Sequence, residues 1–556
     1  MRRTLRSNFK PGTPNWAGRR AQWRSLGLTD EDMEKPKIAV VNSSSELASC
    51  FTHLDGVAAR VKQAIRAAGG LPFEIRTAAP SDFITNAGRR GSYILPTRDL
   101  ITNDIEVQVE GALLDGMLCL ASCDKTTPGQ LMAAGRLNIP TIVVVCGYQQ
   151  SGRYRGEHID IEEVFLKSSY VASGGVSLEE ITEMADNAVR GPGVCAGMGT
   201  ANSMHIVCEA LGMSLPGGAP VLANSPKMMD YVRRAGERIV QMVWDDAKPR
   251  DIMTAESFAN AAMVVLSLSA SINTVKHLQA IAMESQCDVD VYELFSRYAD
   301  KVPLLAAIRP TGEKLIEDLE AAGGARAVMK RLESLLHLNA RTVSGQTLGE
   351  ALRDVTIANE EVIHTLERPV SKPPSLVIVR GSLMPGGGIV RLGGERTLKL
   401  TGPANIFHSR EEAMEAIGRG EVKAGQVVVL RGLGVKGGPG MAMTSSVVFA
   451  LDGAGLIDKV GVVTEGQLSG LVNRGLVVGE ASPEAMDGGP IGLADNGDPI
   501  TIDVEKRVVN LDVPEAVLAQ RREQPRQYGS RNERGWLSIY QRTVQPVHKG
   551  AVLLKE

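Results

Sequence analysis

The densest group of reactive side chains is Cys123, Asp124 and Lys125, which put a thiol, a carboxylate and an ammonium on consecutive residues. They follow an apolar run expected to be a buried strand, 116–121, and precede a stretch with helical spacing, 129–137. Such a turn lies at the C-terminal end of a strand, where α/β proteins place ligands. Two interpretations are open: a polar loop in which Cys123 is merely buried, or metal ligation by Cys123 and Asp124 with Lys125 as base or modified ligand.

Two further cysteines stand in comparable positions. Cys50 comes after the apolar run 37–41 at the start of a helical stretch, and Cys195 lies in a Gly-rich loop before another; with Cys123 they are 73 and 72 residues apart. A thiol near a helix N-terminus ionises more readily, as a metal ligand must. This wide spacing is not a local iron–sulfur signature, so a shared centre and separate cysteines both stay open. The remaining cysteines lie in apolar runs and are interpreted as core: Cys119, Cys146, Cys208 and Cys287.

A third candidate is the glycine pattern of Gly432, Gly434 and Gly437, which matches G-x-G-x-x-G after the apolar run 427–430. A dinucleotide site needs a helix to open at these glycines, so that its N-terminal amides meet a pyrophosphate. Here a Gly-Gly-Pro-Gly string ends the motif and opposes a helix. The pattern therefore favours a constrained loop in a β-domain over nucleotide binding.

The first part of the chain, 37–370, has the pattern of mixed α/β structure, in which alternating strands and helices form parallel βαβ units. The predicted strands are 37–41, 116–121 and 141–146, and the helices between them are 53–68, 99–114 and 129–137. From 177 to 352 the pattern is mainly helical, with helices predicted over 253–271 and 312–338.

A Pro-rich polar segment, 367–375, marks the expected domain boundary. Beyond it lie short apolar runs separated by glycine, a pattern typical of a barrel or sandwich. The predicted strands there are 375–379, 388–391, 426–430, 459–463 and 499–503. We therefore predict an α/β protein with an N-terminal parallel-sheet domain that includes a helical part (1–370), followed by a Gly-rich, β-barrel-like domain (371–556).

Composition excludes several classes of protein. The 556 residues carry 61 Lys+Arg against 64 Asp+Glu, a net charge of −3, which argues against a nucleic-acid partner. No apolar run approaches the roughly 18 residues of a membrane span, and the basic start has no apolar stretch behind it, so we expect neither a membrane partner nor a secretory signal. The seven cysteines are poor material for a disulfide framework and fit a reducing compartment. We expect a globular cytoplasmic protein.

Five strings then occur in order along the chain: CDKTTPG, LMAAGRLNIPTIVV, GVCAGMGTANSM, VKGGPGM and TEGQLSG. Together they resemble the IlvD/EDD dehydratase family, which includes dihydroxy-acid dehydratase and the sugar-acid dehydratases, and the resemblance covers nearly the whole chain. It implies a hydro-lyase that eliminates water from a 2,3-dihydroxy carboxylic acid. The enol product would tautomerise to a 2-keto acid.

The resemblance also implies an iron–sulfur cluster held by Cys50, Cys123 and Cys195. Family members with a third cysteine at the position of Cys50 resemble the [2Fe–2S] type, so we expect that cluster rather than [4Fe–4S]. One incompletely ligated iron would act as Lewis acid on the departing C3 hydroxyl.

A Mg²⁺ ion is the second implied cofactor, with Asp82, Asp124 and a carbamylated Lys125 as ligands. Carbamylation would turn a repelling ammonium into an anionic oxygen ligand of the kind Mg²⁺ prefers. The serine matching Ser469 resembles the base that takes the C2 proton.

Four residues depart from the family pattern. Met443 and Leu433 stand where the family has glutamates, the first of them a Mg²⁺ ligand; Phe83 replaces a glycine and Glu480 a histidine. A thioether is a poor Mg²⁺ ligand. Three explanations are open: Glu480 or another acid supplies the lost charge at the metal, the cation site is weakened, or the protein has left the ancestral reaction.

The substrate is ambiguous from the sequence. The residues before Cys50 resemble sugar-acid dehydratases, whereas the C-terminal segment around Trp536 resembles dihydroxy-acid dehydratase, and we lean to a dihydroxy acid. A catalytically altered member acting as a binding or regulatory protein is the alternative from another class. The family resemblance implies a homodimer or homotetramer.

Overall fold

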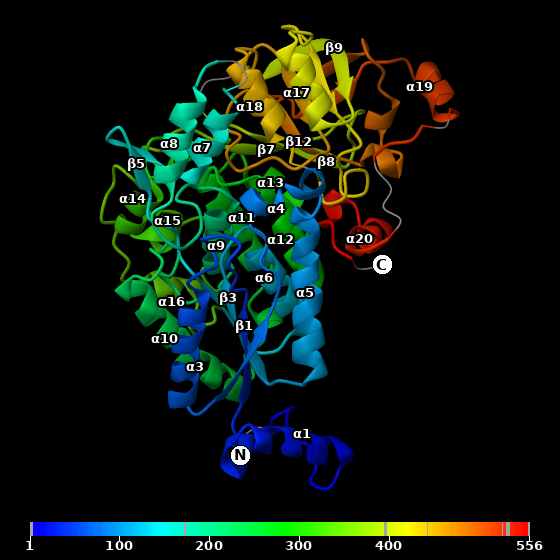
Figure 1. Ribbon diagram of the computed structural model, residues 1–556. Coiled ribbons are helices and arrows are strands. Elements are labelled where there is room, and N and C mark those ends of the chain that lie inside the picture. Colours follow the sequence, from blue (N-terminus) through cyan, green and yellow to red (C-terminus); the bar gives the residue numbers. More distant parts are fainter. Residues whose placement is uncertain are drawn as a thin grey trace.

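Two β-sheets organise the chain, one in each half of the sequence (Figure 1). The computed structural model describes residues 4–171, 174–393, 397–441, 443–524, 526–529 and 534–553, with only the backbone described at Arg89 and Arg90. In these ranges, no helix combines the length and the apolar character needed to cross a lipid bilayer.

The N-terminal sheet has four parallel strands in the order β2-β1-β3-β4. Their bounds are β1 Lys37–Asn42, β2 Leu71–Arg76, β3 Gly116–Ala121 and β4 Thr141–Val145. Strands β1, β3 and β4 are buried along their whole length, which is why they read as continuous apolar runs. The predicted parallel sheet is confirmed.

Helices cover both faces of this sheet. The connecting helices are α3 (Leu54–Ala67), α4 (Asp82–Thr85), α5 (Ile94–Gly111) and α6 (Thr126–Leu137). Helix α3 packs with α10 (Pro226–Asp245) on one side, and α5 packs with α6 on the other (Figure 1). The short helices α1 (Pro14–Ser25) and α2 (Asp30–Met33) precede β1.

The middle of the chain is helical, as predicted, apart from a short hairpin of β5 (Gly152–Tyr154) and β6 (Glu157–Ile159). Its other helices are α7 Ile161–Ser168, α8 Leu178–Ala188, α9 Thr200–Ala210, α11 Ala255–Leu268, α12 Asn273–Glu284, α13 Val291–Tyr298, α14 Ile316–Ala321, α15 Gly324–Arg331 and α16 Leu348–Leu352. Every residue of α9 is buried, and α11 and α12 are almost entirely so.

The single helix predicted over 312–338 is wrong. Two short helices, α14 and α15, stand there instead. The chain breaks at Gly323, whose φ of +117° lies outside the helical region and favours glycine. The apolar spacing on both sides continues through the break, so the pattern alone did not reveal it.

The C-terminal sheet has eight strands in the order β14-β13-β9-β10-β11-β12-β8-β7. Their bounds are β7 Leu376–Val379, β8 Gly387–Arg391, β9 Lys399–Phe407, β10 Val427–Leu430, β11 Gly461–Thr464, β12 Leu476–Ser482, β13 Pro499–Asp503 and β14 Val508–Leu511. A bridge between Arg380, just after β7, and Val508 in β14 links the two edge strands. The sheet is therefore nearly a closed barrel, and the barrel-like prediction is confirmed.

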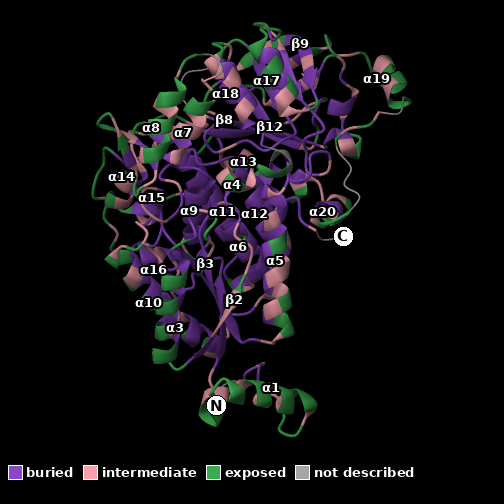
Figure 2. Ribbon diagram, in the orientation of Figure 1, coloured by how far each residue is buried: buried purple, intermediate pink, exposed green. Residues whose placement is uncertain are grey.

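Helices α17 (Arg410–Gly418), α18 (Ser445–Gly453) and α19 (Glu515–Arg522) accompany the barrel. Helix α20 (Trp536–Thr543) lies beside α5 instead, and its Tyr540 shares an apolar cluster with Leu95 of α5 (Figure 1). One continuous apolar cluster includes Ile38 of β1, Val264 of α11 and Val462 of β11. Figure 2 shows the same buried band running from the parallel sheet through α9, α11 and α12 to the barrel. The two halves thus share one apolar core, which packs the parallel sheet and the barrel against the same central helices.

Candidate functional site

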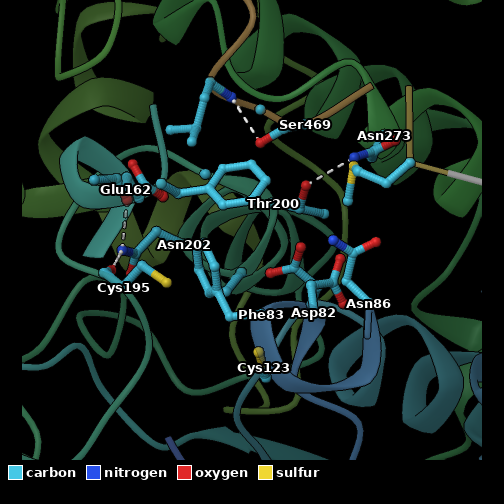
Figure 3. A pocket seen from close by; sticks show the side chains of 18 residues that line it. Asp82, Phe83, Asn86, Cys123, Glu162, Cys195, Thr200, Asn202, Asn273 and Ser469 are labelled. Atoms are coloured by element: carbon cyan, nitrogen blue, oxygen red, sulfur yellow. Dashed lines mark hydrogen bonds between the residues drawn. The ribbon is translucent and has the colours of Figure 1, made fainter. Parts of the chain in front are cut away.

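A pocket lies where the segments that follow β2 and β3 and the N-termini of several helices meet the barrel (Figure 3). Its polar lining consists of Asp82, Asn86, Cys123, Asp124, Glu162, Cys195, Thr200, Asn202, Asn273 and Ser469, and its apolar lining includes Phe83, Phe165, Met443 and Leu471. Sequence segments from both halves of the chain therefore build one site.

Three helices point their N-termini at this pocket. Cys123 and Asp124 directly precede α6, Thr200 begins α9 and Asn273 begins α12. Backbone N–H groups at a helix N-terminus carry partial positive charge and favour anions. An anionic substrate such as a carboxylate, and thiolates, are both favoured at such a place.

The three cysteines predicted to act together lie in loops that touch one another. The Ser122 hydroxyl donates to the carbonyl of Cys50 at 2.5 Å, and the Gly193 N–H donates to the Ser49 carbonyl at 3.3 Å. Cys123 and Cys195 line the pocket, and the Cys50 thiol hydrogen-bonds that of Cys123. Loops from three distant sequence positions thus lie in contact, and the thiols of Cys50 and Cys123 meet.

The chemistry of these thiols fits a metal cluster. The neighbouring Cys50 thiol, followed by burial, raises the pKa of Cys123 well above its usual value. Burial, with the charges of Glu162 and Asp124, raises the pKa of Cys195 in the same direction. All three cysteines are free of disulfides. The raised pKa values disfavour the thiolates of Cys123 and Cys195 on their own, and a metal that binds such thiols replaces their protons.

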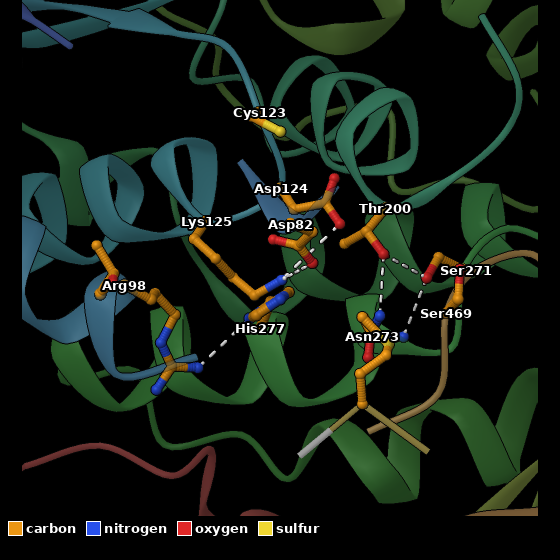
Figure 4. Close-up of polar contacts among 12 residues, drawn as sticks. Asp82, Arg98, Cys123, Asp124, Lys125, Thr200, Ser271, Asn273, His277 and Ser469 are labelled. Atoms are coloured by element: carbon orange, nitrogen blue, oxygen red, sulfur yellow. Dashed lines mark hydrogen bonds and ion pairs between the residues drawn. The ribbon is translucent and has the colours of Figure 1, made fainter. Parts of the chain in front are cut away.

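The second group consists of Asp82, Asp124 and Lys125 (Figure 4). The Lys125 Nζ lies 3.0 Å from Asp82 Oδ2 and 3.8 Å from Asp124 Oδ2, and its side chain is fully buried. Burial acts to lower the pKa of Lys125, but the two carboxylates outweigh it and the pKa is raised. Burial and the nearby Asp82 charge raise the pKa of Asp124 to about 7.

Among the residues that the structure describes, no three His, Cys, Asp or Glu side chains form a group that could hold a metal ion. Two carboxylates do converge, and Asp82 Oδ1 is buried without a hydrogen-bond partner. Such an orphaned oxygen calls for a ligand. The donor set fits a hard cation if Lys125 supplies a further oxygen after carbamylation.

Ser469 comes from the barrel and faces this pocket. Its backbone N–H donates to Ser445 Oγ at 2.6 Å, and the N–H of Leu471 donates to Ser469 Oγ at 3.2 Å. The carbonyl of the preceding Leu468 accepts a hydrogen bond from Asn273 Nδ2 at 3.0 Å. The serine is therefore fixed, and its oxygen already receives one N–H donor that would stabilise negative charge.

Of the predicted site residues, Asp82, Cys123, Asp124, Cys195 and Ser469 line the pocket. Two more, Cys50 and Lys125, contact residues of this lining.

Glu480 is not brought into the pocket. It lies in β12, fully buried, with Oε1 2.5 Å from the Nζ of Lys276. Its carboxylate therefore neutralises the buried Lys276 behind the pocket and does not reach the pocket itself.

The glycine motif forms a loop, and the next helix, α18, begins only at Ser445. The N–H of Gly432 donates to Glu465 at 2.6 Å and that of Gly437 donates to Glu484 at 2.9 Å. Since carboxylates of this chain already occupy these amides, the loop does not offer them to a pyrophosphate.

Three pocket residues escaped the sequence reasoning: Glu162, Thr200 and Asn273. Glu162 stands in an acidic stretch that resembles a solvated helix start, yet it is 8% exposed and no described residue hydrogen-bonds its carboxyl. Burial, followed by the nearby Asp160 and Asp124 charges, raises its pKa well above the usual value. Thr200 and Asn273 are each the first residue of a helix that follows a loop. This position is the sequence feature that could have marked them as pocket residues.

Family models support the common origin of this arrangement. The models named dihydroxy-acid/6-phosphogluconate dehydratase match residues 35–351 with their N-terminal part and 361–551 with their C-terminal part. The chain belongs to this dehydratase family. Its resemblance to the IlvD/EDD group is thereby confirmed.

Relatives in the dehydratase family match over their full length. A dihydroxy-acid dehydratase of Methanococcoides burtonii is 42% identical over 98% of this chain and 99% of its own. The dihydroxy-acid dehydratase of Methanothrix thermoacetophila is 42% identical over 99% of this chain and 100% of its own length. That of Ignicoccus hospitalis is 40% identical over 97% of this chain and 98% of its own length.

Two of the four residues that depart from the expected family pattern, Phe83 and Met443, line the pocket. Met443 lines the pocket, and its sulfur accepts a hydrogen bond from Ser445 Oγ at 3.5 Å. Phe83 packs edge-to-face on Phe165, with 5.5 Å between the ring centroids, and Phe165 packs in the same way on Phe449. One side of the pocket is thus more apolar than the family pattern implies.

Proposed function

We propose that the protein is a dehydratase that removes water from a 2,3-dihydroxy carboxylic acid and yields a 2-keto acid. The observation that carries this proposal is that Ser469, from the barrel, lines the same pocket as Asp82, Asp124, Cys123 and Cys195 from the N-terminal half. A proton acceptor, paired carboxylates and thiols meet there, and relatives that match over their full length are named dihydroxy-acid dehydratases.

We further propose that Cys50, Cys123 and Cys195 hold a [2Fe–2S] cluster and that Asp82, Asp124 and carbamylated Lys125 hold Mg²⁺. When bound, these groups would supply a Lewis acid for the departing hydroxyl and positive charge for the developing enolate. Converging thiols and an orphaned Asp82 oxygen support this assignment.

The chain's own residues then have distinct tasks. Ser469 Oγ takes the proton from C2, and the N–H of Leu471 stabilises the charge on that oxygen before the transfer. The N-termini of α9 and α12 favour the substrate carboxylate. A proton next to a carboxylate is weakly acidic, so this positive environment is what makes its removal feasible.

The apolar wall supports an aliphatic dihydroxy acid. Phe83, Phe165 and Leu471 form an apolar part of the pocket lining that would pack on an alkyl substituent.

A sugar acid is the second candidate, because a wider cavity of about 320 Å³ shares Glu162 and Leu471 with the pocket. Its lining includes Arg309, Asn473 and Arg474, which suit a hydroxylated chain.

The test is a screen of aliphatic 2,3-dihydroxy acids and aldonic acids with anaerobically purified protein, read out as 2-keto acid. We expect turnover of the aliphatic acids, lost in Ser469→Ala and retained in Ser296→Ala, whose serine lies in α13. Turnover of aldonic acids alone would favour the second candidate. Full turnover by Ser469→Ala would contradict the assigned base.

A further inference from the structure

A fully buried ion pair joins the two halves of the protein behind the pocket. Lys276 lies in the first turn of α12 and Glu480 lies in β12 of the barrel, and both side chains are 0% exposed. The Nζ–Oε1 distance is 2.5 Å. An isolated buried charge is very unfavourable, so each of these groups requires the other.

The position of Glu480 depends on an irregularity in the barrel. The register between β12 and β8 shifts between Gly479 and Ser482, and Glu480 itself has a φ of +59°. Bulges re-aim side chains next to functional sites. Here the register shift lies at Glu480, and it turns the Glu480 side chain out of the regular alternation of the strand toward Lys276.

Lys276 also determines which way the Asn273 amide faces. Its ammonium donates to Asn273 Oδ1 as well as to Glu480. Because an ammonium carries hydrogen-bond donors only, it can bond the amide oxygen of Asn273 but not the amide NH₂ group. The Nδ2 of Asn273 must therefore point the other way, toward the pocket.

Two hydrogen bonds follow from this orientation. Asn273 Nδ2 donates to the carbonyl of Leu468 at 3.0 Å and, as Figure 4 shows, to Thr200 Oγ1 at 2.9 Å. The first bond anchors the residue before Ser469. The second occupies one lone pair of the Thr200 hydroxyl, which also shares a hydrogen bond of 2.9 Å with Ser271 Oγ. When Ser271 donates in that bond, the Thr200 proton serves the hydrogen bond to Asp124.

We propose that Lys276, with Glu480 as its counter-ion, is a positioning residue that fixes the Asn273 amide and, through it, the Ser469 loop and the Thr200 contact to Asp124. The role of Ser469 in this statement rests on the proposed function. Glu480 thereby acts at a distance from the reacting atoms, in a position where the family resemblance implies a histidine.

The test compares variants in the full-length protein. Removing Lys276 alone would strand the Glu480 charge, so the double variant Lys276→Met/Glu480→Gln removes both charges and keeps similar volume. Asn273→Asp keeps an acceptor for Lys276 but loses both donors toward the pocket. The matched control is Arg136→Met/Glu284→Gln, which removes another ion pair at the opposite end of α12.

In the double variant and in Asn273→Asp we expect kcat to fall about 10- to 100-fold, with KM changing less than about threefold, because hydrogen bonds to fixed groups are lost and not the pocket itself. Backbone amides of 464–472 should exchange hydrogen faster by mass spectrometry, while the control pair changes neither quantity. Unchanged kcat and unchanged exchange in a folded double variant would overturn the proposal.

The exchange measurement separates this proposal from the proposed function. If Ser469→Ala keeps full turnover while the double variant still loosens 464–472, the base assignment fails and the positioning role stands. If Ser469→Ala is inactive and the double variant has wild-type kcat and exchange, the positioning role fails alone.

Discussion

The Lys125 ammonium lies 3.0 Å from Asp82 Oδ2, although the two residues stand 43 positions apart and follow different strands of the parallel sheet, β3 and β2. Asp124 shares the same ammonium at 3.8 Å. The parallel sheet makes this possible because the C-terminal ends of its strands meet at one edge. Two carboxylates that would repel one another are thereby held around one cation.

Removing the Lys125 ammonium is expected to destabilise the metal-free protein. Lys125→Met leaves Asp82 and Asp124 facing one another without neutralisation, and we expect a loss of about 3 kcal/mol in the free energy of unfolding. Urea unfolding in the presence of a chelator measures it. The double variant Lys125→Met/Asp82→Asn should recover part of the loss, and no difference between the two would argue against the electrostatic cause.

Met443→Glu should strengthen binding of a divalent cation. Met443 lines the pocket that contains Asp82 and Asp124, and a carboxylate is a far better Mg²⁺ ligand than a thioether. We expect about tenfold tighter binding of Mn²⁺, as a spectroscopic substitute for Mg²⁺, by electron paramagnetic resonance. Met443→Gln is the neutral control. Equal affinities in all three proteins would place the cation elsewhere and would support a catalytically altered relative.

The carboxyl of Glu162 is expected to act as a hydrogen-bond donor to substrate. Burial, followed by the nearby Asp160 and Asp124 charges, raises its pKa well above the usual value, which favours the protonated carboxyl. Glu162→Gln keeps a donor of the same shape and should leave KM within about twofold, whereas Glu162→Leu should raise KM about tenfold. Steady-state kinetics on the pair decides, and a large effect of Glu162→Gln would instead indicate a requirement for the carboxylate.

Stability should fall with rising pH because of Glu209. Burial raises the pKa of Glu209 to about 7 from its ordinary value of 4.5, even though Gly217 and Ala219 donate backbone N–H groups to it. Between these two values the folded protein binds more protons than the unfolded chain, so the free energy of unfolding decreases by about 3 kcal/mol as pH rises. Urea titrations across this range should show a flatter dependence for Glu209→Gln; identical slopes would refute the assignment.

Much of the fold could be predicted from the sequence because its signals are local. The fully buried strands β1, β3 and β4 are continuous apolar runs, and the barrel strands are separated by glycine. The break was missed because two consecutive glycines with positive φ, Gly323 and Gly324, interrupt a helix without changing the apolar spacing around them. The near closure of the barrel through Arg380 and Val508 depends on long-range pairing, which no local pattern reveals.

The site residues that stand in recognisable motifs could be predicted from the sequence, whereas those brought to the pocket only by packing could not. Cys123, Asp124 and Ser469 stand in recognisable strings and do line the pocket. Glu162 and Asn273 resemble ordinary helix-start residues, and only the fold turns them inward. The partner of Glu480 could not be found from the sequence because Lys276 lies 204 residues away, in the other half of the chain.

The proposed function requires that three distant cysteines, Cys50, Cys123 and Cys195, hold one iron–sulfur cluster beside the pocket. Its most direct test is the content of iron and acid-labile sulfide, with the visible spectrum, in anaerobically purified wild-type, Cys123→Ser and Cys287→Ser proteins made with intact cluster assembly. We predict about two iron and two sulfide per chain, with visible absorbance, in the wild type and in Cys287→Ser, and their loss in Cys123→Ser. A colourless, iron-free wild-type protein, or an unchanged spectrum in Cys123→Ser, would contradict the claim.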